Sequence, residues 1–157
     1  MNFMNFLRVF LSCSYFIAAD ESGDLKSTDR LLDRHLLFVV KSSTGKNNWI
    51  LPQAEWKAGE SLKQTAERAL SQHVSGIQTK FLGNAPWGVH TIKYPQSVRQ
   101  KKGVQGVKVF FFKAQMTGGK CAVNKTVEHN WLGRKELEQF LDAQYLHSVK
   151  AFLIDEF

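Results

Sequence analysis

Residues 49–76 read WILPQAEWKAGESLKQTAERALSQHVSG, and the prediction of the fold starts from this stretch. Its opening Trp-Ile-Leu predicts a short strand that Pro52 ends, and a Gly-Glu turn follows before a helix. Ser61 is placed to cap that helix, with Gln64 three residues later in the capping-box position, and Gly76 is expected to end it. Helical spacing predicts one buried face, formed by Leu62, Ala66, Ala69, Leu70 and His73 or Val74.

Strands and helices alternate along the rest of the chain, which predicts a single domain of the α/β or α+β class. The expected strands lie at 35–41, in a pair within 79–94, at 107–114 and at 127–132. The expected helices lie at 135–141 and 145–157, with a polar basic loop at 97–106 and a turn at Gly118-Gly119. The last helix carries an apolar stripe expected to pack on the sheet and to extend outward at its end: Leu146, Val149, Phe152, Leu153, Ile154 and Phe157.

The positions of two charged residues in residues 49–76 resemble a Nudix box, G-x5-E-x7-R-E-U-x-E-E-x-G-U, where U is aliphatic. Glu60 and Arg68 keep the seven-residue separation of the box, and Leu70 falls on an aliphatic position. The first glycine of the box falls on Ala54 and the late glycine on Ser75. The three helix glutamates of the box are replaced by Ala69, Gln72 and His73.

These replacements determine the predicted chemistry. A Nudix hydrolase holds Mg²⁺ on carboxylates along one helix face, and Mg²⁺ requires hard oxygen ligands in octahedral geometry. Gln72 offers a neutral oxygen and His73 an imidazole that suits softer metals, while Glu67 points away from the metal face. We therefore expect no bound metal, no cofactor and no catalytic residue. Glu60 and Arg68 are expected to form an ion pair that stabilises the fold.

Four separated blocks of sequence carry a wider resemblance. They read WILPQAEWKAGESLKQTAERAL, KFLGNAPWG, KVFFFKA and, near the end of the chain, WL-x-R-x-E-L followed by YL-x-x-V-x-x-F. In order and spacing they resemble the mitochondrial large-subunit ribosomal protein family numbered forty-six, whose members carry a Nudix-like domain with a degenerate box. The resemblance implies a Nudix-like α/β/α sandwich over residues 35–157, with a mixed sheet, the box helix and C-terminal helices. It also implies a non-catalytic structural component of the mitochondrial large ribosomal subunit, located in the matrix among proteins of the central protuberance.

The N-terminal residues 1–19, MNFMNFLRVFLSCSYFIAA, leave several interpretations open. Arg8, the apolar run and Ala18-Ala19 fit a secretory signal loosely, whereas a single arginine supports a mitochondrial presequence poorly. A membrane anchor needs about 20 apolar residues, and polar residues interrupt this segment, so stable membrane insertion is not expected. An apolar helix packed on the domain, or a misassigned start of the reading frame, would also account for the segment. Family members carry a longer N-terminal region with a presequence, and residues 20–34 here are polar enough to form a linker.

The 157 residues include 21 Lys or Arg and 14 Asp or Glu, which gives a formal net charge of +7 at pH 7. With 43% apolar and 22% charged residues, the composition is that of a globular domain and excludes a mainly disordered, collagen-like, coiled-coil or multi-span membrane protein. The positive excess favours polyanionic partners, nucleic acid above all, and also fits self-repulsion between soluble molecules. Cys13 and Cys121 show no partner spacing for a disulfide framework or a zinc site, which fits a reducing compartment.

Positive charge is concentrated between residues 93 and 113, where six Lys or Arg occur without an acid. Arg99, Lys101 and Lys102 are the candidates for contact with rRNA or a partner protein, and a solvated polar loop is the alternative. The remaining histidines lack metal-ligand spacing and are expected to be structural or on the surface: His90, His129 and His147. Two other functions stay open at this point, a Nudix hydrolase of a nucleoside diphosphate derivative and a nucleotide-sensing binding module.

Overall fold

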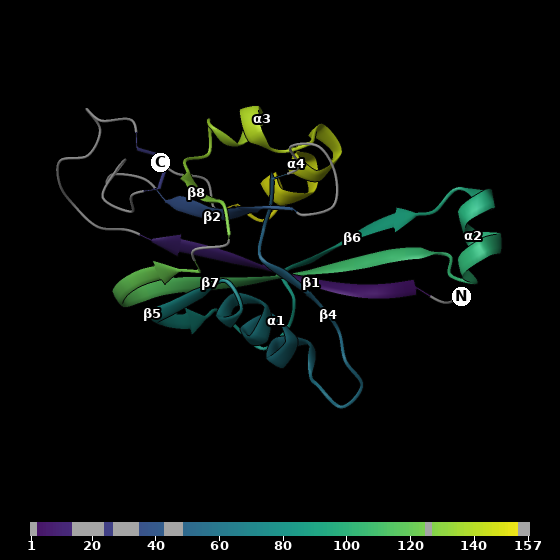
Figure 1. The fold of residues 1–157 in the computed structure, drawn as a ribbon, viewed down its shortest axis with the longest axis horizontal. Helices are drawn as coiled ribbons and strands as arrows, with labels where there is room; N and C mark the ends of the chain where they lie inside the picture. The colour runs from purple at the N-terminus through teal and green to yellow at the C-terminus, as the bar shows by residue number, and fades with distance from the viewer. Residues whose placement is uncertain (1–2, 14–23, 27–34, 43–48, 125–126, 154–157) are drawn as a thin grey trace.

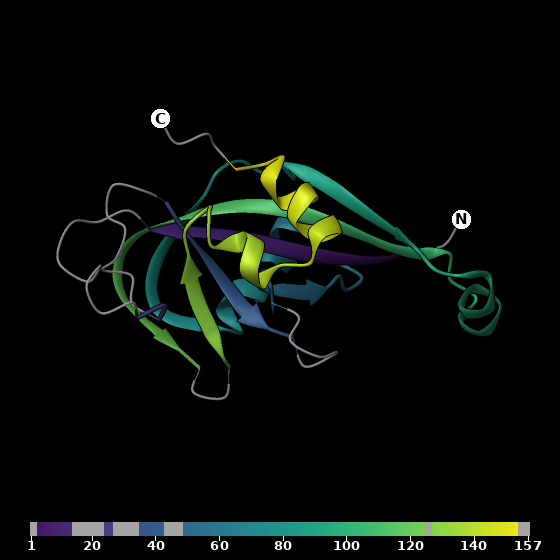
Figure 2. The ribbon, with the colours of Figure 1, turned by 90° about the horizontal axis from the view of Figure 1, so that it is seen from above.

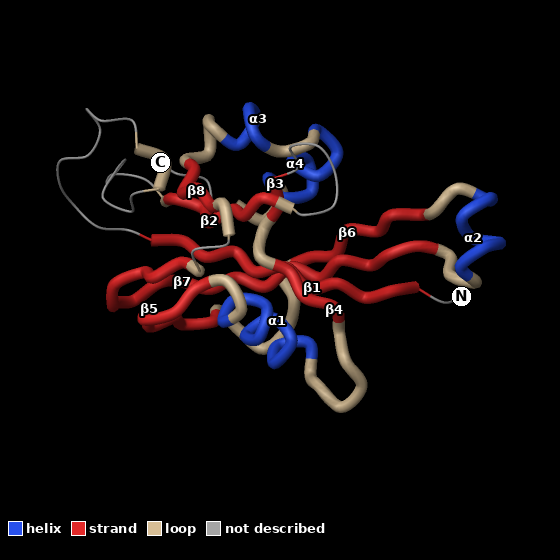
Figure 3. The backbone as a smooth tube through the Cα atoms, in the orientation of Figure 1, coloured by secondary structure: helices blue, strands red, loops and turns tan. Residues whose placement is uncertain are grey.

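The computed structural model describes residues 3–13, 24–26, 35–42, 49–124 and 127–153. Within these ranges the chain forms eight strands and four helices (Figures 1 and 3). In chain order they are β1 (Phe3–Cys13), β2 (Leu36–Lys41), β3 (Trp49–Ile50), β4 (Gln53–Glu55), α1 (Leu62–Ser71), β5 (Val74–Phe81), β6 (Gly88–Lys93), α2 (Gln96–Lys102), β7 (Gly106–Val123), β8 (His129–Leu132), α3 (Leu137–Phe140) and α4 (Ala143–Lys150).

The long strand β7 organises the sheet. Its N-terminal half pairs with β6 and its C-terminal half with β5 along one edge, while β1 runs parallel to it along the other edge. β2 and β4 pair with β1, and β3 and β8 pair with β2, all in antiparallel orientation. The sheet is therefore mixed, as predicted, with the parallel β1–β7 pair at its centre.

Both faces of β2 and of residues 107–114 of β7 are buried, which explains the continuous apolar runs of these two strands. Phe38 of β2 and Phe112 of β7 lie in the core that includes α1, whereas their neighbours Val39 and Phe111 lie in the core that includes α3 and α4. Helix α1 covers one face and α3 and α4 the other, so the predicted α/β/α sandwich is confirmed (Figure 1). The helix residues predicted to face the sheet do so: Leu62, Ala66 and Leu70.

The C-terminal helix α4 packs on its own sheet, as its apolar stripe predicts, but it spans Ala143–Lys150 rather than 145–157, so Phe152 and Leu153 of the stripe follow the helix. Val149 is fully buried, and the centroids of the Phe152 and Phe111 rings lie 4.9 Å apart. The Tyr145 hydroxyl accepts a hydrogen bond from the backbone N–H of Leu51 (3.2 Å), so α4 also holds the segment that follows β3. The predicted outward extension of apolar surface falls on residues 154 and 157, which lie outside the described residues.

Three details of the first half of the domain differ from the sequence prediction. Helix α1 ends at Ser71 rather than at Gly76, because β5 starts shortly afterwards. Of the strand pair predicted within 79–94, the first is β5, which already begins at Val74, and the second is β6; in the described sheet each pairs with β7 rather than with the other. Gly118-Gly119 lies within β7 instead of turning the chain, and a Cβ on Gly119 would come within 2.2 Å of the Gly76 carbonyl oxygen. All three depend on pairing between residues distant in sequence, which local patterns do not record.

The predicted loop at 97–106 contains helix α2. Pro95 immediately precedes the helix, and Gly103 ends it in the left-handed conformation (φ 65°). The helix buries none of its residues. It therefore has no apolar periodicity from which a helix could be predicted.

The N-terminal residues form part of the sheet. β1 pairs with β7 from Phe3, opposite Gly106, to Ser12, opposite Gln115. The interpretation as an apolar helix packed on the domain is therefore wrong, and the sheet begins ahead of the predicted domain start at residue 35. The predicted linker at 20–34 is described at 24–26 only. Across the described parts of the chain, no helix has the length and hydropathy of a membrane span.

Candidate functional site

The box helix begins as the sequence predicts. The Ser61 hydroxyl accepts a hydrogen bond from the backbone N–H of Gln64 (3.2 Å), and the Gln64 side-chain oxygen accepts one from the N–H of Ser61 (2.8 Å). This capping box satisfies two backbone donors at the start of α1. It also fixes the position of Glu60, which directly precedes the cap.

Glu60 accepts hydrogen bonds on both of its carboxylate oxygens. Arg68 Nε donates to Oε1 (2.8 Å), Arg68 Nη2 donates to Oε2 (2.7 Å), and the Thr65 hydroxyl also donates to Oε2 (2.8 Å). The Glu60 and Arg68 side chains are 25% and 23% exposed. The hydrogen bonds from Arg68 and then Thr65 lower the pKa of Glu60 to about 2, and the bonds to Glu60 raise the pKa of Arg68. The ion pair that the sequence predicts is therefore present, in bidentate geometry.

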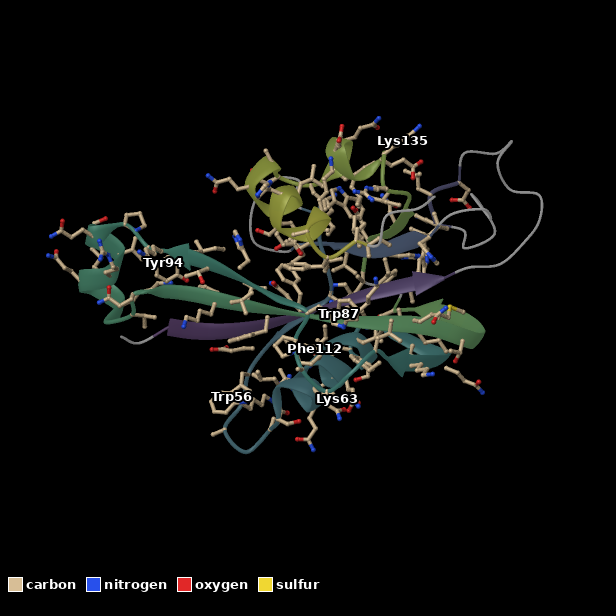
Figure 4. The ribbon with its side chains drawn as sticks, turned by 180° about the vertical axis from the view of Figure 1, so that it is seen from behind. Trp56, Lys63, Trp87, Tyr94, Phe112 and Lys135 are labelled. Carbon is tan, nitrogen blue, oxygen red and sulfur yellow. The ribbon has the colours of Figure 1, made fainter. Side chains whose placement is uncertain are left out.

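The ion pair ties the box loop, residues 55–60, to α1. Arg68 Nη2 donates a further hydrogen bond to the carbonyl of Glu55 (2.8 Å), at the start of the loop. Across the loop, the Trp56 indole N–H donates to the carbonyl of Glu60 (2.8 Å). One arginine thus holds both ends of the loop. Trp56, labelled in Figure 4, is 39% exposed.

Two residues of this arrangement were not identified from the sequence. Thr65 is fully buried, and its hydroxyl is a polar group on the inner face of an amphipathic helix. A hydroxyl on the inner face of the helix, five residues after Glu60, is the sequence feature from which the contact of Thr65 with Glu60 could have been predicted. The contact of Trp56 depends on the fold of the loop and has no local sequence signal.

The three residues that replace the box glutamates have different surroundings. Ala69 is fully buried in the core between α1 and the sheet. Its carbonyl lies 2.8 Å from Nδ1 of the half-buried His73. Gln72 is exposed at the end of α1, where its backbone N–H donates to the Arg68 carbonyl (3.1 Å). A carboxylate at position 69 would have to be buried, so the core has closed over one of the box positions.

The residues present do not fit Mg²⁺. Both oxygens of Glu60 are engaged by an arginine and a hydroxyl, Ala69 has no donor atom, and an imidazole such as that of His73 is a poor ligand for a hard cation. Glu67 is exposed, and its carboxylate lies 4.0 Å from Lys63 Nζ. In the part of the chain that the structure describes, no group of three or more His, Cys, Asp or Glu is arranged to hold a metal ion.

Three further histidines occupy separate environments. Nδ1 of His90 on β6 lies 2.7 Å from the Ser148 hydroxyl on α4. His129 is half-buried in β8, and burial lowers its pKa. His147 is exposed on α4. The three histidines lie on three different elements, and the contact of His90 with Ser148 connects β6 to α4.

The basic candidates Arg99, Lys101 and Lys102 are brought together on α2. All three are exposed on the last turn of the helix. Arg99 Nη1 lies 3.4 Å from the Gln105 side-chain oxygen, and Lys102 Nζ lies 5.7 Å from the centroid of the Tyr94 ring. Figures 1 and 2 both place α2 at one end of the molecule, away from α1, α3 and α4. The structure therefore separates the two groups of sequence-predicted residues.

Comparison with solved structures shows a Nudix-like fold. The Ap4A hydrolase of C. elegans superimposes with a TM-score of 0.62 at 12% identity, over 97% of this chain and 99% of that one. The NUDIX domain of Shewanella oneidensis NrtR, complexed with ADP ribose, superimposes with a TM-score of 0.59 at 13% identity, over 96% and 88%. At these identities the likeness concerns the fold alone, and it confirms the predicted fold class. No protein-family model matches the chain.

Comparison with curated sequences is more specific. The large ribosomal subunit protein mL46 of Bos taurus is 44% identical over 140 residues, which are 87% of this chain and 50% of the relative. The chain is homologous to mL46. The mL46 of Neurospora crassa is 32% identical over 149 residues, which are 87% of this chain and 40% of the relative. The chain thus spans about half the length or less of the mL46 proteins it matches.

Proposed function

We propose that the chain is a non-catalytic structural component of the mitochondrial large ribosomal subunit. The observation that carries this proposal is the 44% identity to bovine mL46 over 87% of the chain. The name of that relative assigns it to the large ribosomal subunit. The mitochondrial matrix is then the site of action, and the reducing environment expected from the cysteines is compatible with it.

The box supports the non-catalytic part of the proposal. An enzyme of this fold needs carboxylates that are free to bind a metal, whereas the Glu60 carboxylate is neutralised by Arg68 within the fold. The position of a second box glutamate is occupied by Ala69 and closed by the core. The remaining box residues, Glu60 and Arg68, form an ion pair that fixes the box loop to α1.

The proposed location within the subunit is the central protuberance, among other ribosomal proteins. This follows from the family resemblance of the four sequence blocks. A fold without free catalytic groups is retained in an assembly for its surfaces, because the site and not the fold determines function. The loop, the exposed strand β6 and the helix exteriors are therefore the candidate contact regions.

Sedimentation of a mitochondrial lysate tests the proposed function. The native chain, detected with an antibody, should migrate with the large subunit and with assembled ribosomes on a sucrose gradient. A matrix enzyme of similar mass serves as the control and should stay near the top of the gradient. If the chain also stays near the top, in the fractions of free proteins, it is not a component of the subunit.

A further inference from the structure

The central part of the sequence is free of acidic residues. Between Glu67 and Glu128 there is no Asp or Glu, while ten Lys or Arg occur. Half of these cations lie in the basic arm, residues 88–111, which comprises β6, α2 and the N-terminal part of β7. A segment of this length without Asp or Glu carries only positive side-chain charges, and a concentration of positive charge attracts a polyanion.

Helix α2, at the tip of the basic arm, is not held by burial. All of its residues are exposed or half-exposed. It is bounded by Pro95 and Gly103, and a hydrogen bond from Tyr94 N–H to the Gln105 carbonyl (3.0 Å) closes its base. With Val98 as its one apolar residue and no buried side chain, the helix gains little stability from packing on its own domain.

The cations of α2 are available to a partner. Within the described residues, Arg99, Lys101 and Lys102 form no ion pair, and the contacts of Arg99 and Lys102 are with a neutral amide and an aromatic ring. Their position in the last turn also suits the helix dipole. The dipole would equally favour acids in the first turn, and none is present there. Helix stability alone therefore does not explain the charge pattern.

The arm favours a nucleic acid backbone over a peptide. Its two large exposed apolar side chains, Val89 and Ile92, are three residues apart on β6 and so point to opposite faces of the strand. They therefore do not share one face of β6. The outer edge of β6 also ends in the exposed Lys93, and an edge lysine disfavours strand addition. Binding of phosphates requires cations alone, and the Arg99 guanidinium matches their geometry.

We propose that the basic arm binds the phosphate backbone of RNA through Arg99, Lys101 and Lys102. The RNA is ribosomal, a point that rests on the proposed function. Recognition is electrostatic and independent of base sequence, because the arm presents charge at its tip. Bound phosphates also screen the mutual repulsion of the three cations, so binding stabilises α2.

Fluorescence anisotropy with a labelled single-stranded RNA of mixed sequence tests the proposal on the full chain. Three phosphate contacts predict that affinity falls about 20-fold between about 50 and 200 mM salt. The triple variant R99E/K101E/K102E should bind at least about ten times more weakly at the lower salt concentration and lose most of the salt dependence. Amide hydrogen exchange should show greater protection of α2 when RNA is bound.

The triple variant K26E/K80E/K135E is the matched control. It has the same net charge, and its exposed positions lie outside the arm, so RNA binding should remain within about twofold of the wild type. An equal loss of affinity in both variants would overturn the proposal, because net charge would then explain binding. RNA binding by the arm variant with wild-type affinity and salt dependence would overturn it as well.

Sedimentation separates this proposal from the proposed function. The arm variant should incorporate into the large subunit more weakly at low salt, and the deficit should shrink as salt weakens the wild-type contact. A chain that sediments with the subunit while its arm variant binds RNA normally refutes the arm proposal and leaves the proposed function standing. In that case the chain docks through protein contacts. A wild-type chain that does not sediment with the subunit refutes the proposed function, whatever the RNA measurement gives.

Discussion

Two charged side chains at the box loop are paired with each other, whereas those of α2, in the basic arm, form no ion pair within the described residues. In the box loop, Glu60 and Arg68 neutralise each other through two hydrogen bonds, and a buried hydroxyl adds a third. On the arm, Arg99 and its neighbours are exposed and have no acid beside them. Charges that are paired inside the domain hold its fold together, whereas charges left unpaired at a tip are available to a partner. The box region is thus held together by contacts within the domain, whereas we propose that the arm makes the contact with a partner.

Restoring a box glutamate at position 69 should destabilise the packing of α1 on the sheet. In Ala69→Glu, a longer and charged side chain enters a position with no exposed surface. We expect a loss of about 3 kcal/mol or more in the free energy of unfolding, measured by urea denaturation. The variant Gln72→Glu adds the same charge at an exposed box position and should change stability by less than about 0.5 kcal/mol. Equal stability of the two variants would mean that the core tolerates a carboxylate at position 69.

Removing the charge of Glu60 should weaken the loop in a pH-dependent way. The pKa of Glu60 in the folded chain is about 2, below the ordinary 4.5, so its stabilising contribution is complete above pH 4.5 and is lost as the pH falls towards 2. Glu60→Gln should therefore melt at a lower temperature than the wild type at neutral pH, and the two melting curves should converge on acidification. Thermal unfolding monitored by circular dichroism measures this. Glu67→Gln, which alters an exposed carboxylate of the same helix, is the control and should melt like the wild type at neutral pH.

A change in the arm should leave the box loop intact. Gly103 ends α2 at a φ of 65°, and a Cβ added there would have no atom within 4 Å, so Gly103→Ala introduces backbone strain without a clash. We expect a local loss of about 1 kcal/mol. Amide hydrogen exchange should then be faster over residues 96–102 and unchanged at the start of α1. Faster exchange at both places would show that the two regions are coupled, contrary to the contrast between a rigid box loop and a separate arm.

The parts of the fold predicted from sequence are those with local signals. The capping box of Ser61 and Gln64, the Glu60–Arg68 pair and the inward face of α1 all follow from spacing within one helix. The apolar run at 35–41 indicated a buried strand because both faces of the sheet are covered. These features need no knowledge of which distant segments meet.

The parts that were missed depend on distant pairing or on the absence of an apolar face. β1 lies at the centre of the sheet through parallel pairing with a strand about a hundred residues away, and its apolar sequence alone equally fits a targeting segment. Helix α2 has no apolar face, so its flanking Pro95 and Gly103 were its only signals. Thr65 and Trp56 entered the site through contacts that form only after the loop folds.

The claim that the box now stabilises the fold instead of holding a catalytic metal is tested most directly by one hydrolysis assay. The full chain and its Glu60→Gln variant are incubated with ADP-ribose in the presence and absence of Mg²⁺, and release of AMP is followed by chromatography. We expect no release above the rate of the variant, with or without Mg²⁺, because the Glu60 carboxylate is held by Arg68 and the other box glutamates are replaced. Release that requires Mg²⁺ and disappears in Glu60→Gln would contradict it.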